Sequence, residues 1–344
     1  MKSFKKEIYQ IHNIMKKIDK NQFNYRIVVT ELVFLILKTE KILFDNNLKK
    51  HPNIYIRKFL KDLILKLSLI IELKDFQNDK KISKQSFILE KTHRYLFNNL
   101  WSYFNEEEYK KERIGRYIKR IKINNLKKII KGKNCVDFGC GHGNFLSALV
   151  LLGAKSGTGI DYGNKSIAYA KKITKKLKLE KKIKFYCKSA YKTGLKKNTY
   201  DFAIQNGVFH HMKFENKAYK EVYRVLKKNG YFWIYTDGGG GIRDFINDLC
   251  QNILKTIDDE YVVKIIRSMN LSKNKVYHLS DHMNAKYRHT TKNELVKRLK
   301  RIGFDNFKQI NGGMKTDLDK PFVKDKYFNI KFGSGDLRFL CQKT

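Results

Sequence analysis

The chain of 344 residues is long enough for two domains, or for one large domain with an extension. Hydrophobic residues make up 42% of it, which excludes a disordered chain, and its two prolines exclude a collagen-like or proline-rich spacer. The formal net charge is +40, but 60 of the 73 cationic residues are Lys and only 13 are Arg. Phosphate-binding sites favour the planar guanidinium of Arg. We therefore attribute most of the charge to a bias toward Lys, Asn, Ile, Phe and Tyr, whose codons are rich in A and T. Weak, salt-sensitive and non-specific nucleic acid binding is still expected.

The cysteines and the apolar segments indicate where the protein resides. The five cysteines are scattered and include no C-x-x-C pair, so neither a zinc site nor a disulfide framework is indicated. Residues 1–20 lack the continuous apolar segment of a signal peptide. The most apolar stretch, 27–44, contains four charged residues and is too short and too charged to span a membrane. These features predict a cytoplasmic protein without a transmembrane segment.

The N-terminal part of the chain has the pattern of amphipathic helices. Apolar residues recur at helical spacing over 25–44 and 54–73, with Lys at intervening positions. The polar residues around His51-Pro52 predict a turn between these helices. The helical signal continues over 83–131, so we predict a helical N-terminal extension over residues 1–132.

From residue 134 the pattern changes to short apolar strands that alternate with helices. This alternation predicts an α/β fold, a Rossmann-like, seven-stranded, doubly wound sheet. The predicted strands cover residues 134–139, 158–161, 183–187, 201–205, 231–236, 304–310 and 336–341. The predicted helices cover residues 144–152, 164–177, 215–228 and 291–301. A largely helical segment at 242–270 and an irregular stretch up to residue 290 interrupt the alternation. We therefore predict one domain over 133–344 with a helical insertion at about 238–290, the place at which this fold commonly carries a lid over its substrate.

The most specific motif is the glycine-rich segment VDFGCGHGN at residues 136–144. It follows a predicted strand and opens a predicted helix, and Asp161 stands at the end of the next strand. Glycine lets the backbone approach a ligand where a Cβ would collide, and a carboxylate at Asp161 can accept both hydroxyls of a ribose. The segment lacks the spacing of the dinucleotide motif G-x-G-x-x-G, and no triphosphate-binding G-x-x-x-x-G-K-[ST] loop is present. It predicts a site for a ligand that contains a nucleoside, at the carboxyl ends of parallel strands.

Four segments, in this order, resemble the consecutive motifs of class I S-adenosylmethionine-dependent methyltransferases. The resemblance is closest to the broad methyltransferase-domain group that acts on small molecules, lipids and sugars, and it covers about residues 133–237. It implies S-adenosylmethionine as the cofactor and implies no metal. The segments are VDFGCGHGNFLSAL, GIDYGNKSIAYAKK, YDFAIQNGVFHHM and EVYRVLKKNGYFWIY.

The resemblance implies a role for each matching residue. Asp161 would hold the ribose, and Tyr162 would lie against the adenine. Asn206 and Val208 would line the wall near the transferred methyl group. The residues expected against the methionine moiety are Asp137, Gly139, Gly141 and Gly143.

The third predicted strand departs from the pattern of the family. Many relatives carry an acidic residue at its end for the adenine amino group, whereas this chain has Lys188-Ser189-Ala190. We expect the adenine to be contacted here by Ser189 and Ala190, either through the Ser189 hydroxyl or through backbone groups.

Two adjacent histidines are the candidate catalytic residues. His210 and His211 follow the fourth strand, where this fold places residues that face the substrate. A neutral imidazole there can remove a proton from an acceptor hydroxyl as the methyl group arrives. The alternative is that one of the two fixes the local turn by hydrogen bonding. The predicted lid holds a further candidate pair for polar or acid–base contacts, Asp281-His282, and also contains His289.

Three functions follow from these features. The first is a methyltransferase that acts on an O or N atom of a small molecule, sugar or lipid-linked precursor. The second is an RNA or ribosome methyltransferase, which the charge favours. Residues 206–209 read N-G-V-F instead of the N-P-P-[YF] used for base amines, which weakens base-amine methylation. The third is a non-enzymatic scaffold, in which helices over 1–120 bind a partner and the methyltransferase-like part is inert.

Overall fold

The computed structural model describes residues 2–72, 106–285 and 287–344. They form two compact units. The helical unit consists of the described residues of Met1–Thr92, Gly240–Lys286 and Lys324–Gly333, and the sheet unit of those of His93–Gly239, Tyr287–Val323 and Ser334–Thr344. The domain boundaries expected from the sequence, 1–132 and 133–344, stay a prediction. In the structure, the helices over 106–130 group with the sheet, and Gly240–Lys286 groups with the N-terminal helices.

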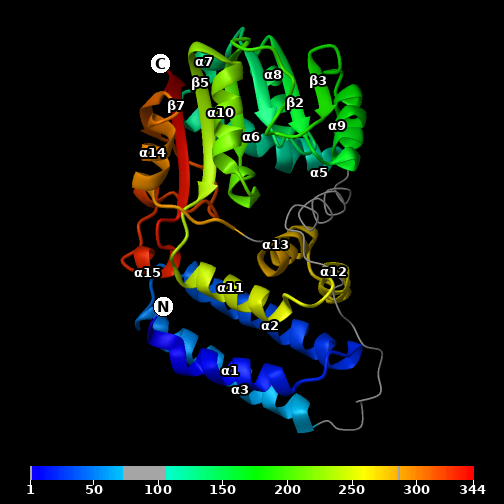
Figure 1. Ribbon diagram of the computed structural model, residues 1–344, viewed down its shortest axis with the longest axis vertical. Coiled ribbons are helices and arrows are strands. Elements are labelled where there is room, and N and C mark those ends of the chain that lie inside the picture. The colour runs from blue at the N-terminus through cyan, green and yellow to red at the C-terminus, as the bar shows by residue number, and fades with distance from the viewer. Residues whose placement is uncertain (1, 73–105, 286) are drawn as a thin grey trace. The chain divides into compact units, whose positions relative to one another are not determined.

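Within the described residues, the sheet unit is built on one seven-stranded sheet in the order β3-β2-β1-β4-β5-β7-β6 (Figure 1). Strands β1 to β5 pair in parallel, and β7 runs antiparallel to both β5 and β6. This confirms the Rossmann-like α/β fold and the seven strands expected from the sequence. The strands are β1 Asn134–Phe138, β2 Ser156–Asp161, β3 Ile183–Cys187, β4 Tyr200–Asn206, β5 Leu226–Asp237, β6 Phe304–Gln309 and β7 Asp336–Lys343.

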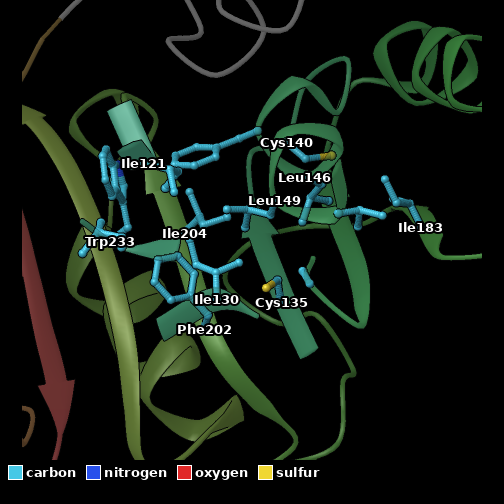
Figure 2. Close-up of a cluster of buried hydrophobic side chains, with 14 of the residues drawn as sticks. Ile121, Ile130, Cys135, Cys140, Leu146, Leu149, Ile183, Phe202, Ile204 and Trp233 are labelled. Carbon is cyan, nitrogen blue, oxygen red and sulfur yellow. The ribbon is translucent and has the colours of Figure 1, made fainter. Parts of the chain in front are cut away.

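Helices cover both faces of this sheet because its strand residues alternate between two apolar clusters. On β4, Phe202 and Ile204 point into one cluster and Ala203 into the other. The first cluster, shown in Figure 2, packs against α6, α7, α8 and α9, and the second against α10 and α14. These helices are α6 Gly115–Ile123, α7 Lys127–Ile130, α8 Asn144–Leu151, α9 Asn164–Lys176, α10 Glu215–Val225 and α14 Lys292–Lys300.

Short elements complete the sheet unit. The segment before α6 is the single turn α5, Glu106–Glu108, followed by the π-helix η4, Tyr109–Ile114. Two 3₁₀ turns, η5 (Phe209–His211) and η6 (Lys320–Phe322), follow β4 and β6.

A buried ion cluster ties the loop after β6 to β7 and α6. Arg338 on β7 is fully buried and pairs with Asp319, and it lies 3.6 Å from both Asp317 and Asp336. Arg120 on α6 donates two hydrogen bonds to Asp317, at 2.7 and 2.9 Å. Burial raises the pKa of Asp319 to about 6, against the opposing effect of Arg338. Two cations and three carboxylates therefore share one site, where each charge depends on its partners.

The helical unit consists of amphipathic helices that bury their apolar residues. The expected helices over 25–44 and 54–73 correspond to α2 and α3. In the part of the chain that the structure describes, no helix is both long and apolar enough to cross a bilayer. The elements are η1 Lys2–Phe4, α1 Lys5–Lys17, α2 Gln22–Leu43, α3 Pro52–Glu72, α11 Ile242–Leu254, α12 Asp259–Ser268, α13 Lys273–Asn284 and α15 Phe328–Phe332.

The segment 242–290 differs from its expected form. The part expected to be largely helical, 242–270, consists of α11 and α12, whereas most of the stretch expected to be irregular, up to residue 290, is helix α13. Capping residues set these boundaries. Asp258 accepts hydrogen bonds from two backbone N–H groups at the start of α12, and the Ser272 hydroxyl accepts one at the start of α13.

Candidate functional site

At two positions of the turn between β1 and α8, the backbone has a conformation that only glycine adopts readily. Gly139 and Gly143 have φ angles of +77° and +76°. A Cβ on Gly139 would lie 2.5 Å from the Val208 side chain, and one on Gly143 would lie 2.5 Å from the Phe185 ring. A Cβ on Gly141 would meet no atom within 4 Å, so the backbone there borders open space. The turn is thus tightly packed on both sides and open at its centre, as a ligand cradle requires.

Asp161 joins this turn to the end of β2. Its Oδ2 accepts the backbone N–H of Gly141 at 2.8 Å, and its Oδ1 accepts that of Gly163 at 2.7 Å. Burial raises the pKa of Asp161, and these backbone hydrogen bonds oppose the rise. Each carboxylate oxygen has a second lone pair, so the group can still accept hydrogen bonds from a ligand. The structure therefore brings Asp161 and Gly141 together.

Asp137 is a second carboxylate of the site, on β1. It is buried, and burial raises its pKa well above the usual range, with a further contribution from the negative charge of Asp161. A buried anion in this environment is costly unless a cation pairs with it. In the folded chain, burial therefore favours the protonated form of Asp137.

The residues expected around the adenine lie at the ends of β2 and β3. Tyr162 follows β2 and is 58% exposed, so its ring is accessible to a flat ligand. The Ser189 hydroxyl accepts the backbone N–H of Tyr191 at 3.2 Å and still has a proton to donate. Ala190 is half-buried and packs against the second apolar cluster. The structure thus places these three residues in loops beyond the same edge of the sheet.

Asn206 and Val208 lie at the end of β4, beside the glycine turn. The Asn206 side chain accepts a hydrogen bond from the Trp233 indole at 3.2 Å and donates one to the Tyr117 hydroxyl at 3.3 Å. The N–H of Val208 donates to the Gln205 side chain at 2.9 Å, and the Val208 side chain approaches Gly139. The turn after β1 and the end of β4 are therefore adjacent walls of one site.

His210 and His211 lie on η5, directly after β4, and both are buried. The backbone N–H of Asp237 donates to Nδ1 of His210 at 3.3 Å, so the proton of that neutral ring is on Nε2. This Nε2 lies 3.0 Å from Nε2 of His211, which must then accept. Tyr287 packs against both rings, with ring centroids at 5.3 and 4.6 Å. The structure brings the expected pair together, as a hydrogen-bonded unit.

Two tyrosines that the sequence did not single out also hold the site. The Tyr109 hydroxyl donates to the backbone carbonyl of His142, inside the glycine turn, at 2.5 Å. Tyr117 stacks on Phe145 of α8 at 4.3 Å and is the partner of Asn206. Their spacing of eight residues, about two helical turns, places them on one helix face, and this periodicity was the signal available in the sequence.

His142 itself is not a proton acceptor near neutral pH. Burial, with a contribution from the charge of Arg113, lowers its pKa to about 3. Its neutral ring packs on Tyr169 with a centroid distance of 4.2 Å.

The candidate pair Asp281-His282 lies on α13 of the helical unit, where burial lowers the pKa of His282 to about 3.

A family comparison covers the part of the chain that carries this site. The family described as "Methyltransferase domain" matches residues 129–303, about half of the chain. A curated relative, "Sterol methyltransferase-like 3" from Botryococcus braunii, is 35% identical over 116 residues. That alignment covers 33% of this chain and 29% of the relative, so the chain spans less than a third of the relative's length.

Solved structures give a weaker likeness. A methyltransferase dependent on S-adenosylmethionine from Aquifex aeolicus is 15% identical, with a TM-score of 0.42. The match covers 70% of this chain and 100% of that one. The YcgJ protein of Bacillus subtilis is also 15% identical, with a TM-score of 0.42, over 64% of this chain and 96% of its own.

Proposed function

We propose a function that follows from the family of this chain. The chain belongs to the methyltransferase-domain family. It is a class I methyltransferase, and its cofactor is S-adenosylmethionine. The proposed activity is transfer of a methyl group to an O or N atom of a small molecule, a sugar or a lipid-linked precursor in the cytoplasm. The proposed site lies at the carboxyl edge of strands β1, β2 and β4.

Three features of this edge fit the cofactor. The open space beside Gly141 is a cradle that a side chain would fill. Asp161 has lone pairs available for two ribose hydroxyls. Asp137, whose buried carboxyl has a raised pKa, would be stabilised as an anion by the ammonium group of the methionine moiety. We propose that Gly139 and Gly143 shape the turn, and that Tyr162, Ser189 and Ala190 surround the adenine.

When bound, S-adenosylmethionine supplies a methyl group that its sulfonium charge has already activated. The residues of the chain must therefore align the acceptor, exclude water and accept a proton. We propose that Asn206 and Val208 form the wall beside the transferred methyl group. Asn206 is suited to orient an acceptor because Trp233 and Tyr117 fix its amide.

The choice of an O or N acceptor depends mainly on one observation, the polar lining after β4. Asn206 is followed within five residues by His210 and His211, and histidine is the side chain that most often serves as a general base. A hydroxyl or amine acceptor must lose a proton when it is methylated, and the sequence makes these histidines candidates to accept it. The similarity to the sterol methyltransferase-like protein supports a lipid among the acceptors.

RNA is the second candidate acceptor because the net charge is +40. The exposed lysines, however, are spread over several helices of both units instead of gathering at the cofactor edge. This distribution supports weak, non-specific binding of nucleic acid more than a dedicated RNA site. Examples are Lys5 and Lys6 on α1, Lys58 and Lys61 on α3, and Lys171, Lys172, Lys175 and Lys176 on α9.

The proposal is tested by incubating the protein with tritiated S-adenosylmethionine and the polar-metabolite, lipid and RNA fractions of a cell extract. Label in the metabolite or lipid fraction is the expected result. Label in RNA that persists at physiological salt would favour the second function. Cofactor binding without label in any fraction would favour an inert scaffold. The Asp161→Ala variant gives the background.

A further inference from the structure

A buried carboxylate and a partly exposed imidazole form a pair at the end of β5. Asp237 is the last residue of β5 and is buried, whereas 30% of the His289 side chain is exposed. Nδ1 of His289 lies 3.7 Å from Oδ2 of Asp237. An ionised carboxylate near Nδ1 favours the tautomer with its proton on Nδ1 and leaves Nε2 as the nitrogen with a free lone pair. Hydrogen bonds between catalytic groups, like the 3.7 Å separation of Nδ1 and Oδ2 here, are often long without substrate and shorten in the reacting complex.

This pair lies beside the residues that follow β4. The N–H of Asp237 donates to His210, and the N–H of Arg288 donates to the carbonyl of His210 at 2.9 Å. Tyr287 stacks on the ring of His210 and lies parallel to that of His289, at 6° and 6.4 Å. In the sheet, β5 pairs with β4 up to Asn206, and β4 pairs with β1 up to Phe138. The pair therefore belongs to the edge at which the proposed acceptor wall lies.

The backbone below His289 is shaped for this ring. Gly239 follows the end of β5 with φ at +60°, and a Cβ there would lie 2.2 Å from the His289 ring. The imidazole thus packs directly on the main chain, where any other residue would displace it. This contact holds the ring close to Asp237 although the segment around it is a loop.

His289 also differs from the His210–His211 pair in what its nitrogens contact. Nε2 of His210 and Nε2 of His211 are engaged with each other at 3.0 Å, so protonation of His211 at that atom requires the bond to break. Among the described residues, no hydrogen bond to Nε2 of His289 is found, and its side chain is accessible.

We propose that His289 is the general base of the methyl transfer and that Asp237 orients it. This rests on the proposed function and makes His210 and His211 positioning residues.

The proposal defines the class of acceptor, a neutral hydroxyl or an amine that still carries a proton. As the bond from the acceptor atom to methyl forms, the bond from methyl to sulfur breaks and its electron pair stays on sulfur. The O–H or N–H bond of the acceptor breaks, and its proton passes to Nε2 of His289. The imidazolium is paired with Asp237 until the proton leaves to solvent through the exposed side of the ring.

His289→Asn and Asp237→Asn test this role, with His12→Asn as the control because His12 is an exposed histidine on α1. Transfer of label from tritiated S-adenosylmethionine into the fraction that the wild-type protein labels is expected to fall by about 100-fold or more in His289→Asn. A smaller fall is expected in Asp237→Asn, and none in His12→Asn. Calorimetry should give a cofactor affinity within about threefold of the wild type for all three variants. Transfer by His289→Asn at the wild-type rate would overturn the proposal.

A second measurement does not depend on turnover. In ¹⁵N NMR of the imidazole, wild-type His289 should show its proton on Nδ1, and Asp237→Asn should lose this preference. A ring with its proton on Nε2 in the wild type would overturn the proposal even if no acceptor is found. Absence of transfer by the wild type in every fraction would instead count against the proposed function, so the two failures are distinguishable.

Discussion

Replacing Asp161 by Ala removes the residue that connects the glycine turn to the proposed ribose site. Its carboxylate accepts the N–H groups of Gly141 and Gly163, and we propose that it also accepts two ribose hydroxyls. A hydrogen bond to a charged group contributes about 1.5–3 kcal/mol. Loss of the two ribose bonds alone should weaken cofactor binding by about 3 kcal/mol, which is roughly 100-fold, and the freed turn adds to this loss.

Calorimetric titration with S-adenosylmethionine measures this effect. Asp201→Ala is the matched control because Asp201 also accepts a backbone N–H, that of Asn134 at 2.9 Å, but does so at the opposite end of the sheet. Asp201→Ala should lower stability and keep the affinity. An Asp161→Ala protein that is folded and binds the cofactor within about threefold of the wild type would refute the reasoning.

Three further predictions concern other groups of the site and fold. Because the pKa of Asp137 is raised in the folded state, its protonated form favours folding and this stability is lost as pH rises through that pKa. The free energy of unfolding of Asp137→Asn should therefore exceed that of the wild type by about 1 kcal/mol at neutral pH and by less in acid, and the variant should lose cofactor binding. Equal stability of the two proteins at both pH values would contradict this prediction. Tyr109→Phe should weaken cofactor binding up to about tenfold in calorimetry, while the exposed Tyr9→Phe control should not. Arg338→Met removes the cation beside the buried carboxylates of Asp319 and Asp336, whereas Asp317 keeps Arg120, and it should cost about 3–5 kcal/mol in urea unfolding. The exposed Arg26→Met should cost little, and equal losses would argue against the cluster.

The parts of the site that depend on local backbone geometry could be predicted from the sequence. The positive φ angles at Gly139 and Gly143 exclude most other residues, so the turn is visible as a spacing of glycines. Asp161 follows from its place at the end of the next strand. Both features depend on a few neighbouring residues, and the motif contains all of them.

Element boundaries were less predictable where one pattern suits two structures. The helix expected over 215–228 ends at Val225, and β5 begins at Leu226. Asn229 has a positive φ of 60°, and the pairing of β4 with β5 shifts register between Tyr200 and Phe202. The Asn229-Gly230 pair indicates a turn in the sequence, but in the structure it lies inside a strand that continues past the irregularity.

Contacts between distant segments could not be predicted. Tyr109 and His142 are separated by 33 residues, and Asp237 and His289 by 52, with no local pattern to relate them. The two histidines nearest the motif, His210 and His211, were therefore the visible candidates for the base. Only the folded sheet shows that Asp237 and His289 lie beside them.

The position of the transferred methyl group in the product tests the central claim most directly. The protein is incubated with S-adenosylmethionine that carries a ¹³C-labelled methyl group and with the extract fraction that takes up label, and the product is analysed by ¹³C NMR. The account predicts a methyl carbon bonded to oxygen or nitrogen of a metabolite, sugar or lipid. A methyl group bonded to carbon, or found in RNA, would contradict it.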